Sequence, residues 1–138
     1  MRPRGCEQLG ALHTVVADGA HVDAVKELTD GNGAEVVIDF VAEQGAENAG
    51  WEMTRRAGSY YVIGYGGTVH IETLAIISTE RNVVGNLVGT YNDLAELMVL
   101  AQAGKVTLHT KTYPLEAALD AIEDLDNGRI RGRGILVP

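Results

Sequence analysis

Unbroken apolar runs alternate along the chain with segments whose apolar residues recur at helical spacing. Residues 35–41 read EVVIDFV and contain no regular alternation of apolar and polar positions. Such a run is typical of a strand buried on both faces, as in a parallel sheet covered by helices. Shorter β-branched or apolar segments predict further strands at residues 13–17, 60–63, 69–72, 83–89, 106–113 and 134–137.

Apolar residues at helical spacing lie between these strands and predict helices near residues 22–28, 44–55, 91–103 and 115–126. Thr90 and Asp93 have the spacing of a helix cap, and Gly104 is placed to end that helix. Strands that alternate with helices predict an α/β fold. Ligands of such folds bind at the carboxyl ends of the parallel strands.

Glycine is more frequent than its usual share of roughly 7%, with 17 residues in the chain. Three of these glycines, Gly64, Gly66 and Gly67, follow the strand at 60–63, and Gly89 ends the strand at 83–89. The strand ends are therefore the expected site. No helix begins directly after Gly67, so this segment is not a dinucleotide-binding fingerprint.

Composition excludes several classes of function. The formal net charge of −8 argues against a nucleic-acid surface, which needs clustered basic side chains. No apolar run reaches the length of about 18 residues that a membrane span requires. The only cysteine, Cys6, can form no intrachain disulfide, and Glu7 follows it where a secretory signal would be apolar. We therefore expect a cytoplasmic protein.

Four segments occur in an order that resembles a known family. They are EVVIDFV at 35–41, YYVIG at 60–64, VVGNLVG at 83–89 and GRIRGRGILV at 128–137. Their order and spacing resemble the second half of the medium-chain, zinc-type, NAD-dependent alcohol dehydrogenases. The resemblance extends over nearly the whole chain from about Glu7.

The resemblance implies a partial Rossmann-type fold. The coenzyme domain of that family is a doubly wound, mostly parallel sheet ordered 3-2-1-4-5-6. This chain would supply strands three to six as a partial coenzyme-binding domain at residues 1–105. Residues 106–138 would form a strand-helix-strand tail that completes the catalytic domain. The first two strands, the G-x-G-x-x-G turn and the zinc-binding domain have no counterpart in this sequence.

The resemblance also implies coenzyme contacts. Side chains and backbone near Phe40 and Val41 would line the coenzyme near its ribose, and Arg133 would bind its pyrophosphate. Backbone groups at two strand ends would face the nicotinamide carboxamide: Val62, Ile63, Gly64, Asn86, Leu87 and Val88. By residue type alone, Phe40 and Val41 read as core residues and Arg133 as part of a solvated basic turn. Ala42 stands where the family usually has glycine, which weakens the case for close backbone approach.

Catalytic and metal-binding groups are not evident. The four histidines have no partner at the spacing of metal ligands: His13, His21, His70 and His109. The acidic side chains of the last helix predict a solvated face: Asp120, Glu123, Asp124 and Asp126. The sequence therefore predicts neither a catalytic residue nor a zinc ligand, although zinc belongs to the full-length family.

Function follows from the resemblance, with two alternatives open. The family transfers a hydride between an alcohol and NAD or NADP, and this chain would supply the nicotinamide side of the coenzyme pocket and be inactive alone. One alternative is a zinc-free quinone or enoyl reductase of the same superfamily. The other is a non-catalytic, truncated dimerisation module. Residues 83–88 form an apolar edge segment without Pro, Lys or Glu, which predicts a homo-oligomer.

Overall fold

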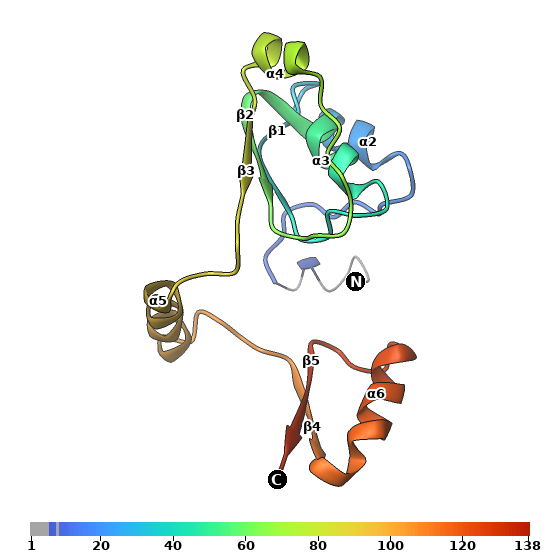
Figure 1. Cartoon of the computed structure of the whole chain (residues 1–138), viewed down its shortest axis with the longest axis vertical. Coiled ribbons are helices and arrows are strands. Elements are labelled where there is room, and N and C mark those ends of the chain that lie inside the picture. The colour runs from blue at the N-terminus through green and yellow to red at the C-terminus, as the bar shows by residue number, and fades with distance from the viewer. Residues whose placement is uncertain (1–5, 8) are drawn as a thin grey trace. The chain divides into compact units, whose positions relative to one another are not determined.

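The computed structural model describes residues 6, 7 and 9–138 of the chain. Two compact units can be distinguished, residues 1–88 and residues 89–138. Each unit contains its own parallel sheet (Figure 1). The division falls before the helix that follows Gly89, earlier in the chain than the boundary predicted after residue 105.

The first unit is built on a three-stranded parallel sheet. Its strands are β1 (Ala34–Asp39), β2 (Thr54–Val62) and β3 (Asn82–Gly85), in the spatial order β1-β2-β3. Helix α2 (His21–Glu27) precedes β1, α3 (Ala46–Met53) connects β1 to β2, and α4 (Thr73–Thr79) connects β2 to β3. These crossovers make the strands parallel, so β1 and β2 end at the same edge of the sheet.

Tyr60 is the centre of the core of this unit. Its side chain is entirely buried where α3 lies against the sheet. A Cβ atom on Gly50 of α3 would lie 2.5 Å from the Tyr60 ring, so the glycine lets the helix approach closely. The hydroxyl of buried Thr54 donates to the Gly50 carbonyl at 2.8 Å, and Trp51 is buried beside them.

The second unit begins with α5 (Tyr91–Gln102) and continues as a strand-helix-strand motif. Strand β4 (Thr110–Pro114) is followed by a short 3-10 turn (Leu115–Ala117), by α6 (Ala118–Asp126) and by β5 (Arg133–Val137). Strands β4 and β5 are parallel neighbours. The predicted α/β fold with a strand-helix-strand tail is therefore confirmed.

The predicted cap of α5 is also confirmed. The Thr90 backbone N–H donates to the Asp93 carboxylate at 2.6 Å, and the Asp93 N–H donates to the Thr90 hydroxyl at 3.3 Å. Both bonds occupy backbone donors that a helix leaves unpaired at its N-terminus. The bond from the Thr90 N–H, together with one from the Thr90 hydroxyl to the same carboxylate at 2.8 Å, holds the pKa of Asp93 below its usual range.

Asp124 of α6 corrects one prediction from the sequence, because it is not part of a merely solvated face. Its carboxylate accepts hydrogen bonds from Lys111 at 2.6 Å, from the Tyr113 hydroxyl at 2.7 Å and from Arg129 at 2.6 Å. These three donors hold the pKa of Asp124 well below its usual range. The cluster ties α6 to β4 and to the turn before β5.

Two predicted strands are absent from the described residues, and one helix was not predicted. Residues 13–17 and 69–72 are irregular rather than β-strands, and helix α4 was not anticipated. A strand needs a hydrogen-bonded neighbour, and neither segment has one among the described residues. Helix α4 reads TLAIIST, whose β-branched residues favour strand, so its helical conformation is set by its place between β2 and β3.

Candidate functional site

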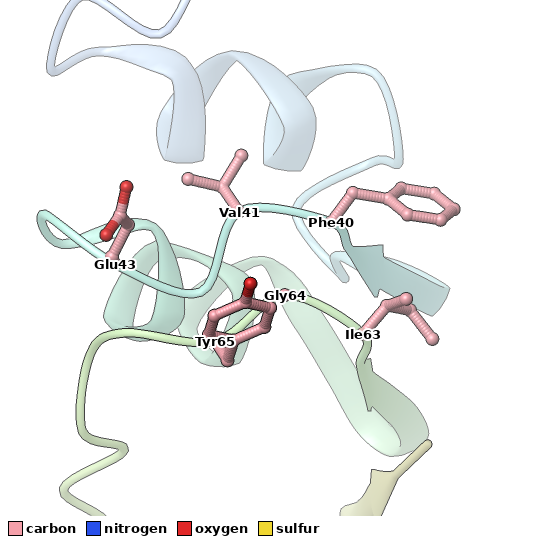
Figure 2. Close-up of a pocket in the computed structure, with 6 residues that line it drawn as sticks. All are labelled: Phe40, Val41, Glu43, Ile63, Gly64 and Tyr65. Atoms are coloured by element: carbon pink, nitrogen blue, oxygen red, sulfur yellow. The ribbon is translucent and has the colours of Figure 1, made fainter. Parts of the chain in front are cut away.

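A pocket lies where β1 and β2 end, at the position expected for a parallel sheet (Figure 2). Its volume is about 540 Å³, and six residues line it: Phe40, Val41, Glu43, Ile63, Gly64 and Tyr65. Four of them were predicted as site residues from the sequence, namely Phe40, Val41, Ile63 and Gly64. The fold therefore brings together two segments that lie more than twenty positions apart in the sequence.

Two short connections form the walls of this pocket. Phe40, Val41 and Glu43 lie on the segment that leads from β1 to α3, and Ile63 and Tyr65 on the segment that follows β2 (Figure 2). Phe40 is 75% exposed and Tyr65 is 92% exposed. Solvent-exposed aromatic rings beside a pocket offer flat apolar surface to a ligand.

Asp39, the last residue of β1, connects the two walls. Its backbone carbonyl accepts from the N–H groups of Ile63 and Gly64, both at 2.9 Å. Its carboxylate atom Oδ1 accepts from the N–H groups of Val41 at 2.8 Å and of Ala42 at 2.9 Å. One residue therefore fixes the backbone on both sides of the pocket.

Tyr60 completes this arrangement from the core. Its hydroxyl donates to Oδ2 of Asp39 at 2.8 Å, and both side chains are buried. Burial raises the pKa of Tyr60 well above its usual value, and the hydrogen bond to Asp39 raises it further. The phenol therefore keeps its proton and remains a donor to the carboxylate. Sequence analysis missed this role, for which the only signal was an acid at the end of an apolar run.

Gly64 is required by close packing. A Cβ atom at this position would lie 2.5 Å from the Val41 carbonyl oxygen and 2.7 Å from the Phe40 carbonyl carbon. Only glycine lets the segment after β2 lie so near the segment after β1. Ala42 on the opposite wall is buried and has a φ of 47°, a left-handed conformation that costs a non-glycine residue energy.

The other predicted contact residues do not line the pocket. The Val62 carbonyl accepts from the Asn86 N–H at 3.0 Å, which joins the ends of β2 and β3. Leu87 and Val88 follow, with exposures of 91% and 100%. Arg133 belongs to the second unit, where it opens β5 and its N–H donates to the His109 carbonyl at 2.9 Å. The roles predicted for these residues stay predictions.

Within residues 6, 7 and 9–138, no three His, Cys, Asp or Glu side chains gather in a group that could hold a metal ion. The side chains described here therefore do not fit a zinc site. None of the described helices is long and apolar enough to cross a membrane.

Comparison with known proteins shows a consistent set of relatives. Residues 2–103 match the family model described as zinc-binding dehydrogenase. An NAD-dependent alcohol dehydrogenase of Saccharolobus solfataricus is 34% identical over 116 residues, which cover 83% of this chain and 33% of the relative. A D-arabinose 1-dehydrogenase (NADP(+)) of the same organism is 30% identical over 116 residues, with 83% of this chain and 33% of the relative covered.

Solved structures agree with this assignment. The alcohol dehydrogenase of the hyperthermophilic archaeon Aeropyrum pernix superposes with a TM-score of 0.90 at 38% identity. The match covers 99% of this chain and 40% of that structure. The chain spans about a third of the length of the curated relatives that it matches. On its sequence and its fold, the chain belongs to the zinc-binding dehydrogenase family and is related to its medium-chain, NAD-dependent alcohol dehydrogenases.

Proposed function

We propose that this chain forms a coenzyme-binding portion of an oxidoreductase that transfers a hydride between an alcohol and NAD. The observation that carries the proposal is the pocket at the carboxyl ends of β1 and β2. It places Phe40, Val41, Ile63 and Gly64 around one space, in a chain that matches the zinc-binding dehydrogenase family. Apolar walls with a few fixed polar groups are typical of cofactor sites.

The residues of the chain bind and orient in this proposal, and the coenzyme supplies the hydride chemistry. Phe40, Val41 and Ile63 offer apolar surface to the ribose and the ring next to it. Gly64 keeps the two walls close together, and Asp39 holds both of them in one geometry. No step is assigned to a metal, because the described side chains do not form a metal site.

A binding experiment tests the proposal directly. NAD added to ¹⁵N-labelled chain should shift the amide signals of Val41, Ile63 and Gly64 more than those of β4 and β5. We expect an affinity on the order of millimolar, because the chain spans only about a third of its relatives. Shifts confined to the second unit would contradict the proposal. A micromolar dissociation constant would instead show that the chain alone binds the coenzyme fully.

The 138-residue chain is proposed to be inactive by itself. The described residues form no metal site, and no catalytic acid or base was identified at the pocket. NADH formation from primary and secondary alcohols should remain at the level of a blank, with and without added zinc. Zinc-dependent reduction of NAD by this polypeptide would contradict the proposal.

The finer organisation is also proposed. Residues 1–105 are assigned to coenzyme binding and residues 106–138 to the tail; the parallel pair β4 and β5 with α6 between them supports a separate tail. We assign residues Asn86, Leu87, Val88 and Arg133 to coenzyme contacts on the family resemblance. We propose self-association through residues 83–88, and the exposure of Leu87 and Val88 supports it. A cytoplasmic location is proposed from the single cysteine.

A further inference from the structure

Three arginines lie in the turn formed by residues 129–133 between α6 and β5, which we call the basic turn. Arg129 is engaged within the protein, since its Nε donates to Asp124 at 2.6 Å and its Nη2 donates to Glu123 at 3.1 Å. Arg131 and Arg133 are exposed, and neither forms an ion pair with a carboxylate of the described residues. Their two guanidinium groups are therefore available to an anion from outside the chain.

The backbone of the basic turn is anchored at both ends. At its start, the Arg129 N–H donates to the Asp124 carbonyl at 2.8 Å, in addition to the side-chain bond between the same two residues. At its end, the Arg133 N–H donates to the His109 carbonyl at 2.9 Å. Gly132 has a φ of 83°, and a Cβ atom there would overlap the His109 carbonyl. The turn is thus pressed against the residue before β4 and has little freedom to take another course.

Asp124 also determines which cations of this region remain free. Its carboxylate is mostly buried, with 18% of the side chain exposed, and it accepts from Lys111 and from Arg129, both at 2.6 Å. The Tyr113 hydroxyl donates to it as well. Asp124 therefore has its acceptor sites occupied within the protein, and it keeps two of the nearby cations turned inward. Only the remaining two arginines of the basic turn face solvent without a described partner.

We propose that Asp124 is a positioning residue that holds the basic turn in the shape in which Arg131 and Arg133 together bind a phosphate or pyrophosphate anion. The inference rests on the proposed assignment of Arg133 to coenzyme contacts, and it adds Arg131 as a second ligand and Asp124 as their support. A guanidinium binds phosphate oxygens through two parallel N–H groups, so the direction of the side chain matters as much as its charge. Asp124 does not touch the anion and acts through the backbone of the turn.

The direction of the effect separates positioning from charge. Asp124→Asn removes a negative charge beside the turn, so electrostatics alone predicts tighter binding of an anion. Loss of positioning predicts weaker binding. Arg129→Lys provides the same test without a change of charge, because lysine lacks the planar fork that holds Asp124 and Glu123 together. Asp126→Asn is the matched control, because it removes an exposed carboxylate from the end of the same helix outside the Asp124 cluster.

The experiment titrates inorganic pyrophosphate into the ¹⁵N-labelled chain at constant ionic strength and follows the side-chain Nε–H signals of Arg131 and Arg133. Both signals should shift with one dissociation constant. Asp124→Asn and Arg129→Lys should each weaken the affinity by about two- to fivefold, as expected for exposed charged contacts that lose their alignment. Asp126→Asn should not weaken it. The amide signals of β4 and β5 confirm at the same temperature that each variant is folded, and Arg129→Lys decides the question if Asp124→Asn is not.

The outcomes distinguish this inference from the proposed function. Weaker binding by the two cluster variants, with Asp126→Asn unaffected, supports the inference. Unchanged or tighter binding by Asp124→Asn and Arg129→Lys, or a shift confined to Arg133, overturns the inference and leaves the assigned contact of Arg133 standing. If pyrophosphate shifts neither arginine, the inference and the assignment of Arg133 are both wrong. The pocket of the first unit is judged separately, by the shifts that NAD causes at Val41, Ile63 and Gly64.

Discussion

At the scale of single residues, Asp39 and Gly64 determine the shape of the pocket. Asp39 accepts hydrogen bonds from both walls and from the buried Tyr60. Gly64 permits a contact between the walls that any side chain would block. Neither residue needs to touch a ligand to affect binding, because each controls the backbone that lines the site.

Tyr60→Phe tests the contribution of the buried phenol. The variant keeps the ring and removes the hydroxyl that donates to Oδ2 of Asp39. Loss of a hydrogen bond to a buried carboxylate costs about 1–3 kcal/mol of unfolding free energy. Urea denaturation at pH 7 measures it. Tyr65→Phe is the control, since that ring is 92% exposed and should change stability little.

The same variant gives a pH prediction. The pKa of Tyr60 is raised in the folded chain, by burial first and then by Asp39. An unfolded tyrosine ionises near pH 10, so above that pH the unfolded chain releases a proton that the folded chain retains. Stability is therefore complete below about pH 10 and is lost as the pH rises further. The wild type should lose stability more steeply than Tyr60→Phe under alkaline conditions. Parallel alkaline profiles would contradict this origin of the shift.

Gly64→Ala tests the close approach of the two walls. The added methyl would overlap the Val41 carbonyl, and overpacking of this kind costs about 1–3 kcal/mol. Amide signals of Val41 and Ala42 should move, and denaturation should occur at a lower urea concentration. Gly85→Ala is the matched control, because nothing lies within 4 Å of a Cβ atom at Gly85. Equal stability of the two variants would show that the contact is not tight in solution.

At the scale of elements, the sequence predicted most of the architecture and little of the side-chain network. Continuous apolar runs located β1, β2 and β3, and the Thr90–Asp93 spacing located the start of α5. The segment at 13–17 has apolar residues but no neighbouring strand, and pairing rather than composition decides whether a strand forms.

The pocket was predicted only in part, because its side-chain contacts depend on strand register and on the course of the turns. Strand ends and glycines indicated where Phe40 and Gly64 would meet. The bond between Asp39 and Tyr60 joins residues 21 positions apart on neighbouring strands, and it depends on register. Glu43 gave no signal in the sequence, because its place at the pocket follows from the turn after β1. The Asp124 cluster was missed likewise, since its donors come from β4 and from the turn after α6.

Asp124→Asn tests how much the Asp124 cluster contributes to the stability of the strand-helix-strand motif formed by β4, α6 and β5. The variant removes the charge that Lys111 and Arg129 share, so β4, α6 and β5 should melt at a lower temperature. The pKa of Asp124 is lowered in the folded chain. Its contribution is therefore present above the unfolded pKa of about 3.9 and is lost as the pH falls below it.

The measurement is the thermal loss of amide signals from β4 and β5 at neutral and at acidic pH. The difference between wild type and Asp124→Asn should be large at pH 7 and small in acid. Asp126→Asn is the control, because it removes an exposed carboxylate at the end of α6 that is not part of the Asp124 cluster. A decrease in melting temperature for Asp124→Asn that does not change with pH would indicate that packing, and not charge, is the cause.

At the scale of the whole molecule, the sheet of the first unit has two open edges among the described strands. Strand β3 is one edge, and β1 is the other. Both carry exposed apolar side chains, including Ile38 on β1 and Val83 on β3. Open edges with apolar surface favour pairing with another chain.

Leu87→Lys tests the proposed self-association at residues 83–88. The unmodified chain should elute from size-exclusion chromatography as a dimer or larger species by light scattering. Lysine at this exposed position, two residues beyond the end of β3, should shift the population toward monomer, because a charge beside a strand edge opposes pairing. Leu108→Lys is the control, an equally drastic change at another exposed leucine. A 14.7 kDa monomer for the unmodified chain, or a dimer that Leu87→Lys leaves intact, would contradict this interface.

The hydrogen bonds that Asp39 accepts also have a consequence for hydrogen–deuterium exchange. The amides of Val41, Ala42, Ile63 and Gly64 lie outside the strands and would be expected to exchange as rapidly as other loop amides. The N–H groups of Ile63 and Gly64 donate across to the Asp39 carbonyl, so their exchange must wait until β1 and β2 separate at their carboxyl ends. Val41 and Ala42 donate to the Asp39 carboxylate within their own turn, so opening of that turn is enough for them to exchange. Ile63 and Gly64 should therefore be protected together with the strand amides of β1 and β2, and their shared rate would report the lifetime of the closed pocket in the absence of any ligand.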